Sequence, residues 1–229
     1  MKTIGIVGGI GPESTVEYYR SIIAAYRGRK QDGSYPSIII NSIDMKRLVD
    51  LIAADELTEV SEYLAGEVKT LERAGADFGL LAANTPHIVF DEIRRRSAIP
   101  LISIVEATRG AAKAMGLKRI GLFGTRFTMR AGFYRDAFSE EGMTRVVPNE
   151  GEQDYIHEKY MSELVPGVFL PETRERLLSI ADRMREQEGI EGLILGGTEL
   201  PLILRDDTHG GIPFLDTTRI HVDAAVAQL

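Results

Sequence analysis

Residues 75–85 read GADFGLLAANT, and residues 189–199 read GIEGLILGGTE. Both stretches start with a glycine, carry an acidic residue close behind it, and run through a short apolar segment into small polar residues. A short apolar run bounded by turn residues is typical of a strand buried on both faces of a parallel sheet. Because the two stretches lie half of the 229-residue chain apart, they indicate a duplicated α/β unit.

A second pair of stretches supports the duplication. Residues 4–9 read IGIVGG and residues 120–125 read IGLFGT, at nearly the same interval. Chance is the alternative, since any parallel α/β protein contains similar strands, but two nearly equal intervals favour duplication. We therefore predict one lobe from residues 1–103 with 217–229 and a second lobe from residues 104–216.

Apolar strand-like runs alternate with longer helical patterns along the chain, as where TIGIVGG precedes ESTVEYYRSIIAAYR. This alternation predicts the α/β class, with two pseudo-symmetric lobes that each hold a mostly parallel sheet flanked by helices. In open parallel sheets, ligands bind beyond the carboxyl ends of the strands. We therefore expect the site at the strand ends, in a cleft between the lobes.

The composition is that of an ordinary globular protein, with 44% hydrophobic and 27% charged residues. The net charge of −7 is spread along the chain, which argues against nucleic acid as a partner. The first apolar stretch, residues 4–10, is too short for a membrane span or a signal peptide, so we expect no membrane partner and a cytoplasmic location. Cysteine is absent, which excludes disulfides, thiolate zinc sites and thiol catalysis.

The turn at residues 8–14, GGIGPES, is similar to a dinucleotide-binding loop. The spacing fails because Ser14 stands where the third glycine belongs, and Glu13 would repel a pyrophosphate. Two interpretations remain open: a turn whose backbone approaches a small ligand closely, and a purely structural turn. We expect no cofactor.

Hydroxyl and amide side chains follow the predicted strands. Thr125 and Thr128 are either helix caps or donors to a ligand carboxylate. Asn84 and Thr85 follow a buried strand that Pro86 ends. Asn84 either forms an Asx turn there or holds a ligand.

The titratable residues near these positions also have two interpretations. Glu199 is either a carboxylate in the first turn of a helix or an acid in the cleft. His87 and His221 are more typical of surface or structurally bonded histidines than of catalytic ones. His157 begins HEKYM, which lacks the second histidine of the helical zinc pattern. We predict no metal site.

Five motifs together resemble the aspartate/glutamate racemase family of cofactor-independent amino-acid racemases. They are TIGIVGGIGPEST, ANTPH, GTRFTM, GGTELP and FLDTTRIH, and they cover essentially the whole chain in the family's order. The resemblance implies two pseudo-symmetric α/β lobes with the site between them, which agrees with the duplication. It also implies a small amino acid or dicarboxylate as the ligand, no cofactor, and commonly a homodimer.

The resemblance further implies that two groups needed for racemisation are missing. Such racemases use two cysteines on opposite faces of the substrate α-carbon, one as base and one as acid. These positions hold Ala83 and Gly197, whose side chains transfer no protons. Residues 164–168, LVPGV, stand where some members offer a lysine, which counts against selectivity for an acidic side chain. The positions that match the family's ligand-binding residues are Gly9, Ile10, Arg47, Asn84, Thr85, Thr125, Thr128 and Thr198.

Three hypotheses follow. In the first, another group performs acid–base chemistry in an isomerase, epimerase or lyase, and the candidates are Glu199, His87, His221 and Tyr19. In the second, the protein keeps the ligand site without turnover. In the third, native cysteines were replaced by design, which the unlike residues Ala83 and Gly197 disfavour. Restoring both cysteines is expected to create racemase activity.

Overall fold

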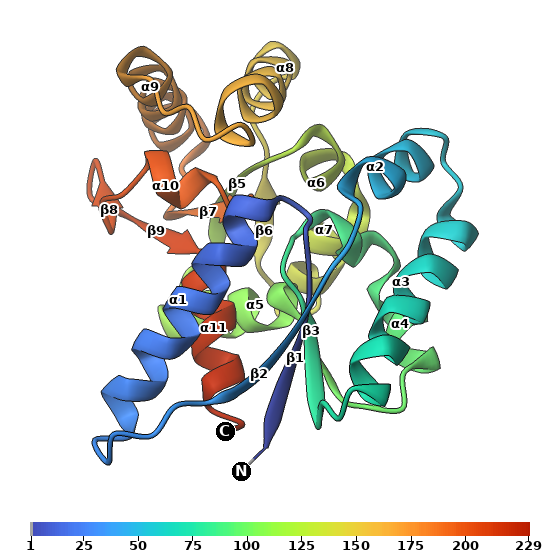
Figure 1. Ribbon diagram of the computed structural model, residues 1–229. Helices are drawn as coiled ribbons and strands as arrows, with labels where there is room; N and C mark the ends of the chain where they lie inside the picture. The colour runs from blue at the N-terminus through green and yellow to red at the C-terminus, as the bar shows by residue number, and fades with distance from the viewer. Residues whose placement is uncertain (1) are drawn as a thin grey trace. The chain divides into compact units, whose positions relative to one another are not determined.

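The computed structural model describes residues 2–229 and divides the chain into two compact units (Figure 1). One unit contains the chain up to Ile104 together with His221–Leu229, and the other contains Val105–Ile220. Each unit has its own, mainly parallel sheet with helices packed on it. This arrangement confirms the predicted α/β class with two parallel-dominated sheets. The predicted cleft concerns how the two units face each other, and it stays a prediction.

The sheet of the first unit is parallel throughout. Its strands in spatial order are β2 (Ser37–Ser42), β1 (Thr3–Gly8), β3 (Phe78–Leu81) and β4 (Leu101–Ile102). Val7 of β1 pairs in register with Leu81 of the neighbouring strand β3. The residues that follow these two strands therefore leave the sheet at the same edge.

Helices cover both faces of this sheet. They are α1 (Pro12–Arg29), α2 (Met45–Ala53), α3 (Leu57–Arg73), η1 (Thr85–Val89), α4 (Phe90–Arg96) and the second half of α11 (Thr217–Val226). Ile4 and Ile6 point to one face because side chains alternate along a strand, and they share an apolar cluster with α1 and α11. Gly5 points to the other face, where Leu71 of α3 lies against it.

The sheet of the second unit has five strands. In spatial order they are β6 (Thr144–Val146), β5 (Arg119–Gly124), β7 (Gly192–Gly196), β9 (Ile212–Asp216) and β8 (Thr208–His209). All neighbouring strands are parallel except β8 and β9, which form an antiparallel hairpin. Gly124 pairs with Gly196, so Thr125 and Gly197 follow at the same edge.

The helices of the second unit include one irregular turn. They are α5 (Ile104–Ala114), α6 (Arg126–Arg130), α7 (Gly132–Ser139), α8 (Glu150–Lys159), η2 (Tyr160–Leu164), α9 (Pro171–Glu188) and α10 (Leu200–Ile203). A capping box between Asn149 and Glu152 starts α8, and Arg183 of α9 forms an ion pair with Glu152. The end of α8 continues directly into η2, which is a π-helical turn.

The loop after β1 requires glycine at position 9. Gly9 has a φ of +83°, and a Cβ there would lie 2.4 Å from the Ile43 carbonyl oxygen. Gly75 also has a positive φ, +97°, but nothing lies within 4 Å of its Cβ position. An alanine would therefore strain the backbone at either position. Only at position 9 would its Cβ also overlap neighbouring atoms.

We expect Gly75→Ala to lower the free energy of unfolding by about 1 to 2 kcal/mol, the strain of a left-handed backbone. We expect Gly9→Ala to lower it by about 2 kcal/mol more. The additional loss comes from the overlap with Ile43. Urea denaturation of both variants and the wild type measures the difference. Equal losses would mean that the loop around Gly9 moves without cost.

Candidate functional site

The loop after β1 is held by its own hydrogen bonds. The Gly9 N–H donates to Thr15 Oγ1 at 2.8 Å, and the Ser14 hydroxyl donates to the Gly11 carbonyl at 2.8 Å. The neighbouring Ile10 is buried. The Gly9 N–H is therefore engaged within the loop, and the close approach of a ligand to its backbone stays a prediction.

Residues 82–85 leave the sheet at the same edge as this loop. The Ala82 N–H donates to the Val7 carbonyl at 2.9 Å, and Ala83 and Asn84 are both buried. The Asn84 carbonyl accepts the His87 N–H at 2.9 Å, which closes the turn into η1. The family's first thiol position thus carries the methyl group of Ala83, at a strand end that brings Asn84 and Thr85 with it.

Arg47 lies on α2, close behind the end of β2. Its guanidinium group stacks over the ring of Tyr63, 4.1 Å from the ring centroid, and its side chain is exposed. Stacking uses the face of the guanidinium, whereas a carboxylate binds the N–H groups at its edge. The predicted role of Arg47 in binding a carboxylate is compatible with this geometry.

His87 is held as a structural histidine. Its Nε2 accepts the backbone N–H of Ile104 at 3.2 Å, so Nδ1 carries the proton and donates to the Ala83 carbonyl at 3.1 Å. The ring stacks on Phe90 with a centroid distance of 4.5 Å. Burial, with the nearby His221, lowers the pKa of His87 to about 3. Both ring nitrogens are engaged, so the geometry favours the structural interpretation over catalysis.

His221 is held in the same way. Its Nε2 donates to the Ile102 carbonyl at 3.0 Å, and its Nδ1 accepts the hydroxyl of Tyr18 at 2.8 Å. The residue is fully buried, and burial lowers its pKa to about 4. His221 therefore joins α11 to α1 and β4 within the first unit, and we do not assign it a proton-transfer role.

In the second unit, Thr125 caps the short helix α6. Its side chain accepts the Thr128 N–H at 3.2 Å, and the two hydroxyl oxygens are 3.1 Å apart. Both residues are buried. The cap interpretation of Thr125 therefore describes the geometry, and the role of the two hydroxyl groups in ligand binding stays a prediction.

The space beside Gly197 is occupied by an aromatic ring. A Cβ at position 197 would lie 2.4 Å from Cε2 of Tyr160 and 2.9 Å from the Tyr160 hydroxyl oxygen. At such distances a residue with a side chain cannot be accommodated at position 197 unless the Tyr160 ring moves. The family's second thiol position thus holds a glycine without a side chain. The space that a side chain would take there is occupied by the ring of Tyr160, which projects from η2.

Tyr160 also binds the acid that follows this strand end. Its hydroxyl donates to Glu199 Oε2, and the Thr198 hydroxyl donates to the same oxygen at 3.0 Å. All three residues are buried. Burial and the neighbouring Glu199 carboxylate raise the pKa of Tyr160 well above its ordinary value. The result is a buried phenol and carboxylate joined by a hydrogen bond.

This arrangement changes what we expect of restored cysteines and adds a residue to which the sequence motifs do not point. A side chain at position 197 would overlap the Tyr160 ring in this geometry, so we predict that cysteines at positions 83 and 197 alone do not restore racemisation. Tyr160 lies in the HEKYM segment, whose only recognisable pattern is an incomplete zinc motif. Tyr19, the remaining candidate for acid–base work, is 47% exposed on α1.

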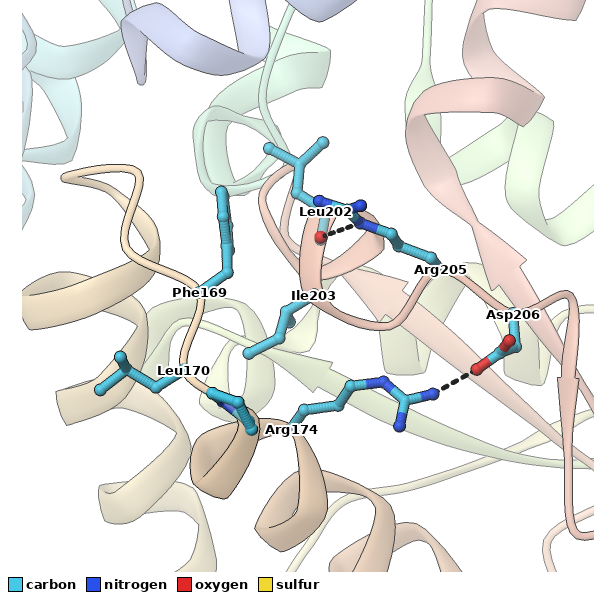
Figure 2. Close-up of a pocket in the computed structure, with 8 residues that line it drawn as sticks. Phe169, Leu170, Arg174, Leu202, Ile203, Arg205 and Asp206 are labelled. Atoms are coloured by element: carbon cyan, nitrogen blue, oxygen red, sulfur yellow. Dashed lines mark hydrogen bonds and ion pairs between the residues drawn. The ribbon is translucent and has the colours of Figure 1, made fainter.

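A separate open cavity of about 480 Å³ lies on the second unit and contains none of the predicted site residues (Figure 2). Its lining residues are Phe169, Leu170, Pro171, Arg174, Leu202, Ile203, Arg205 and Asp206. Arg174 is bonded to Asp206, and Arg205 Nε donates to the Leu202 carbonyl at 2.8 Å. These bonds stay within the cavity wall, so we assign no chemistry to it.

Among residues 2–229, no three His, Asp or Glu side chains are grouped so that they could hold a metal ion. The helices of this region include none that is both long and apolar enough to cross a membrane.

The fold and the strand ends define a two-sheet α/β protein with small polar residues at the strand ends and no thiol. The sequence profile of the family described as Asp/Glu/Hydantoin racemase matches residues 7–225. The chain therefore belongs to this family, which confirms the resemblance found in its motifs.

Individual relatives agree with this assignment. The chain is 26% identical over 225 residues to the broad specificity amino-acid racemase RacX of Bacillus subtilis (strain 168), over 94% of this chain and 92% of that protein. The crystal structure of an aspartate racemase homologue from Pyrococcus horikoshii OT3 is 36% identical, with a TM-score of 0.83 over 100% of this chain and 98% of that chain. The Picrophilus torridus aspartate racemase shares the fold, at 22% identity and a TM-score of 0.78 over 100% and 94% of the two chains.

Proposed function

We propose that the protein binds a small amino acid or dicarboxylic acid at its strand ends and does not racemise it by the two-thiol route. One observation carries the second half of this proposal: the Tyr160 ring fills the space that a side chain at position 197 needs. Ala83 offers only a methyl group at the other thiol position. Family membership and the retained polar residues support the first half.

The residues proposed to bind the ligand's carboxylate groups are those that match the family's binding positions. In the first unit these are Asn84 and Thr85, with Arg47 for a distal carboxylate and with the backbone at Gly9 and Ile10 for close approach. In the second unit they are the hydroxyls of Thr125 and Thr128 and the backbone N–H of Thr198, whose own hydroxyl donates to Glu199 Oε2. Hydroxyl, amide and guanidinium groups are the donors that a carboxylate accepts. A homodimer in the cytoplasm is part of the same proposal.

Turnover divides the proposal into two alternatives. The protein is either a ligand-binding homologue without turnover or an isomerase or lyase that uses a group other than sulfur. Proton NMR in D2O with L-aspartate, L-glutamate and a panel of other amino and dicarboxylic acids separates them. Loss of an α-proton signal identifies a catalyst, while binding without loss of signal identifies a binding protein.

We expect Asn84→Ala to weaken the affinity for the bound acid at least tenfold, because an amide that hydrogen-bonds a buried carboxylate contributes about 1.5 to 3 kcal/mol. Isothermal titration calorimetry measures the affinity, and circular dichroism checks the fold.

Asn149→Ala is the control for this substitution. It removes the cap of α8, which costs about 1 kcal/mol of stability, but Asn149 is outside the proposed site. We expect its affinity to equal that of the wild type. An unchanged affinity in Asn84→Ala would defeat the assignment of Asn84, whereas equal losses in both variants would trace the effect to stability.

A further inference from the structure

We propose that Tyr160 and Glu199 form a proton-transfer pair that acts on one face of the ligand's α-carbon. The inference rests on the proposed function, because it takes a bound carboxylic acid as its substrate. Its starting point is the position of the Tyr160 hydroxyl oxygen, 2.9 Å from the place of a Cβ on residue 197. The phenol oxygen therefore lies where a thiol side chain at residue 197 would begin, and its proton is directed at Glu199.

The partners of Tyr160 suit it for proton transfer. Its hydroxyl donates to Glu199 Oε2, so a proton acceptor stands directly behind the phenol. The Thr198 hydroxyl donates to the same carboxylate oxygen at 3.0 Å and holds it in position. A carboxylate that accepts the proton of a hydroxyl group is the usual arrangement for activating that hydroxyl as a base.

The local fold fixes this geometry. Tyr160 is the first residue of η2, and π-helical turns occur frequently at functional sites. Its ring belongs to the apolar cluster of the second unit, together with Leu164 and Leu200. Glu199 directly precedes the short helix α10. Both members of the pair are therefore attached to packed elements of the second unit.

The proposed step is a relay. The α-carbon–hydrogen bond of the acid breaks, and its electron pair stays on the α-carbon, where the neighbouring carboxylate delocalises it. The α-proton passes to the Tyr160 oxygen as the hydroxyl proton of Tyr160 passes to Glu199 Oε2. In D2O the protons held on Tyr160 and Glu199 exchange with solvent deuterons before the relay reverses, so reversal places a deuteron on the same carbon, and no other reactant is consumed.

The relay has a stereochemical consequence. Ala83, at the family's other thiol position, cannot deliver a proton from the opposite face. A proton removed and returned by Tyr160 arrives on the face it left. The inference therefore predicts exchange of the α-proton with solvent and retention of configuration, which is the first half of a lyase or isomerase reaction rather than racemisation.

The test measures exchange and configuration together. Aspartate, glutamate, alanine and succinate are incubated with the protein in D2O, α-proton loss is followed by NMR, and chiral chromatography gives the configuration of the amino acids. Calorimetry with the same acids measures binding independently. We expect exchange in at least one acid that binds, with its configuration retained.

Two substitutions that preserve shape test the pair. Tyr160→Phe keeps the ring and Glu199→Gln keeps the side-chain length, and each should reduce the exchange rate at least about 100-fold, the lower range for general acid–base catalysis. The affinity should change little. Tyr155→Phe, on the neighbouring helix α8, is the matched control and should exchange at the wild-type rate.

The outcomes separate the inference from the proposed function. Binding without exchange in the wild type, exchange that inverts the configuration, or full exchange in Tyr160→Phe would each overturn the proton-transfer pair while leaving the ligand site intact. Failure of every acid to bind would instead overturn the proposed function, and the pair would lose its substrate with it.

Discussion

Lowering the pH from 7.5 to 5.0 is expected to reduce the free energy of unfolding by about 4 kcal/mol, because His87 and His221 are buried as neutral imidazoles. Burial lowers the pKa of His87 to about 3 and that of His221 to about 4. An exposed histidine, as in the unfolded chain, has a pKa near 6.5. Each unit of difference between the folded and unfolded pKa corresponds to about 1.4 kcal/mol of unfolding free energy.

The sign follows from proton binding. Between these pKa values the unfolded chain binds protons that the folded chain does not bind, so stability rises with pH. The stabilisation is complete above a pH of about 6.5 and is lost progressively as the pH falls toward the two folded values. Ordinary carboxylates are ionised in both states above pH 5 and contribute little in this range.

Urea denaturation at the two pH values measures the effect. His87→Gln and His221→Gln each remove one titrating group, and each is expected to reduce the loss between pH 7.5 and pH 5.0 to about 2 kcal/mol. A wild-type loss below about 1 kcal/mol would mean that the folded protein protonates its buried imidazoles.

The sequence predicted the two sheets because their central strands carry a strong local signal. Four short apolar runs end in glycine or polar residues. They are residues 4–9, residues 120–125 and the strands before residues 84 and 198. Such runs indicate buried parallel strands whatever surrounds them. The β8–β9 hairpin carries no comparable signal, since its first strand has only the two residues Thr208–His209.

The candidate site was predictable only in part. Strand ends located Asn84, Thr125 and Thr198, because their position follows from local sequence alone. The contact between Tyr160 and Gly197 joins two distant segments through a π-helical turn, and such a turn leaves no periodic pattern in the sequence. The hydrogen-bond partners of a histidine are likewise set by packing.

Restoring racemase chemistry is expected to require three substitutions rather than two. In the double variant Ala83→Cys with Gly197→Cys, the new side chain at 197 overlaps the Tyr160 ring, since its Cβ would lie 2.4 Å from Cε2. Overpacking of this kind costs about 1 to 3 kcal/mol and displaces the neighbouring side chain. We therefore expect the double variant to be destabilised and to show little activity.

Adding Tyr160→Val makes room for the second thiol. Tyr160→Val removes side-chain volume and Gly197→Cys adds some beside it, so the total volume is approximately conserved. Protein cores tolerate such volume-conserving exchanges best. The Thr198 hydroxyl, 3.0 Å from Glu199 Oε2, still donates to that carboxylate after the phenol is removed. We expect the triple variant to regain part of the stability and to racemise the bound acid at least about 100-fold faster than the double variant.

Chiral chromatography of the bound amino acid and urea denaturation decide this prediction together. If the double variant is as stable and as active as the triple variant, the ring of Tyr160 moves aside without cost and does not block position 197. If the triple variant binds the acid and folds but does not invert it, positions 83 and 197 do not flank the α-carbon. The comparison with Tyr160→Val alone, which has no thiols, separates the contribution of the two cysteines from the effect of removing the ring.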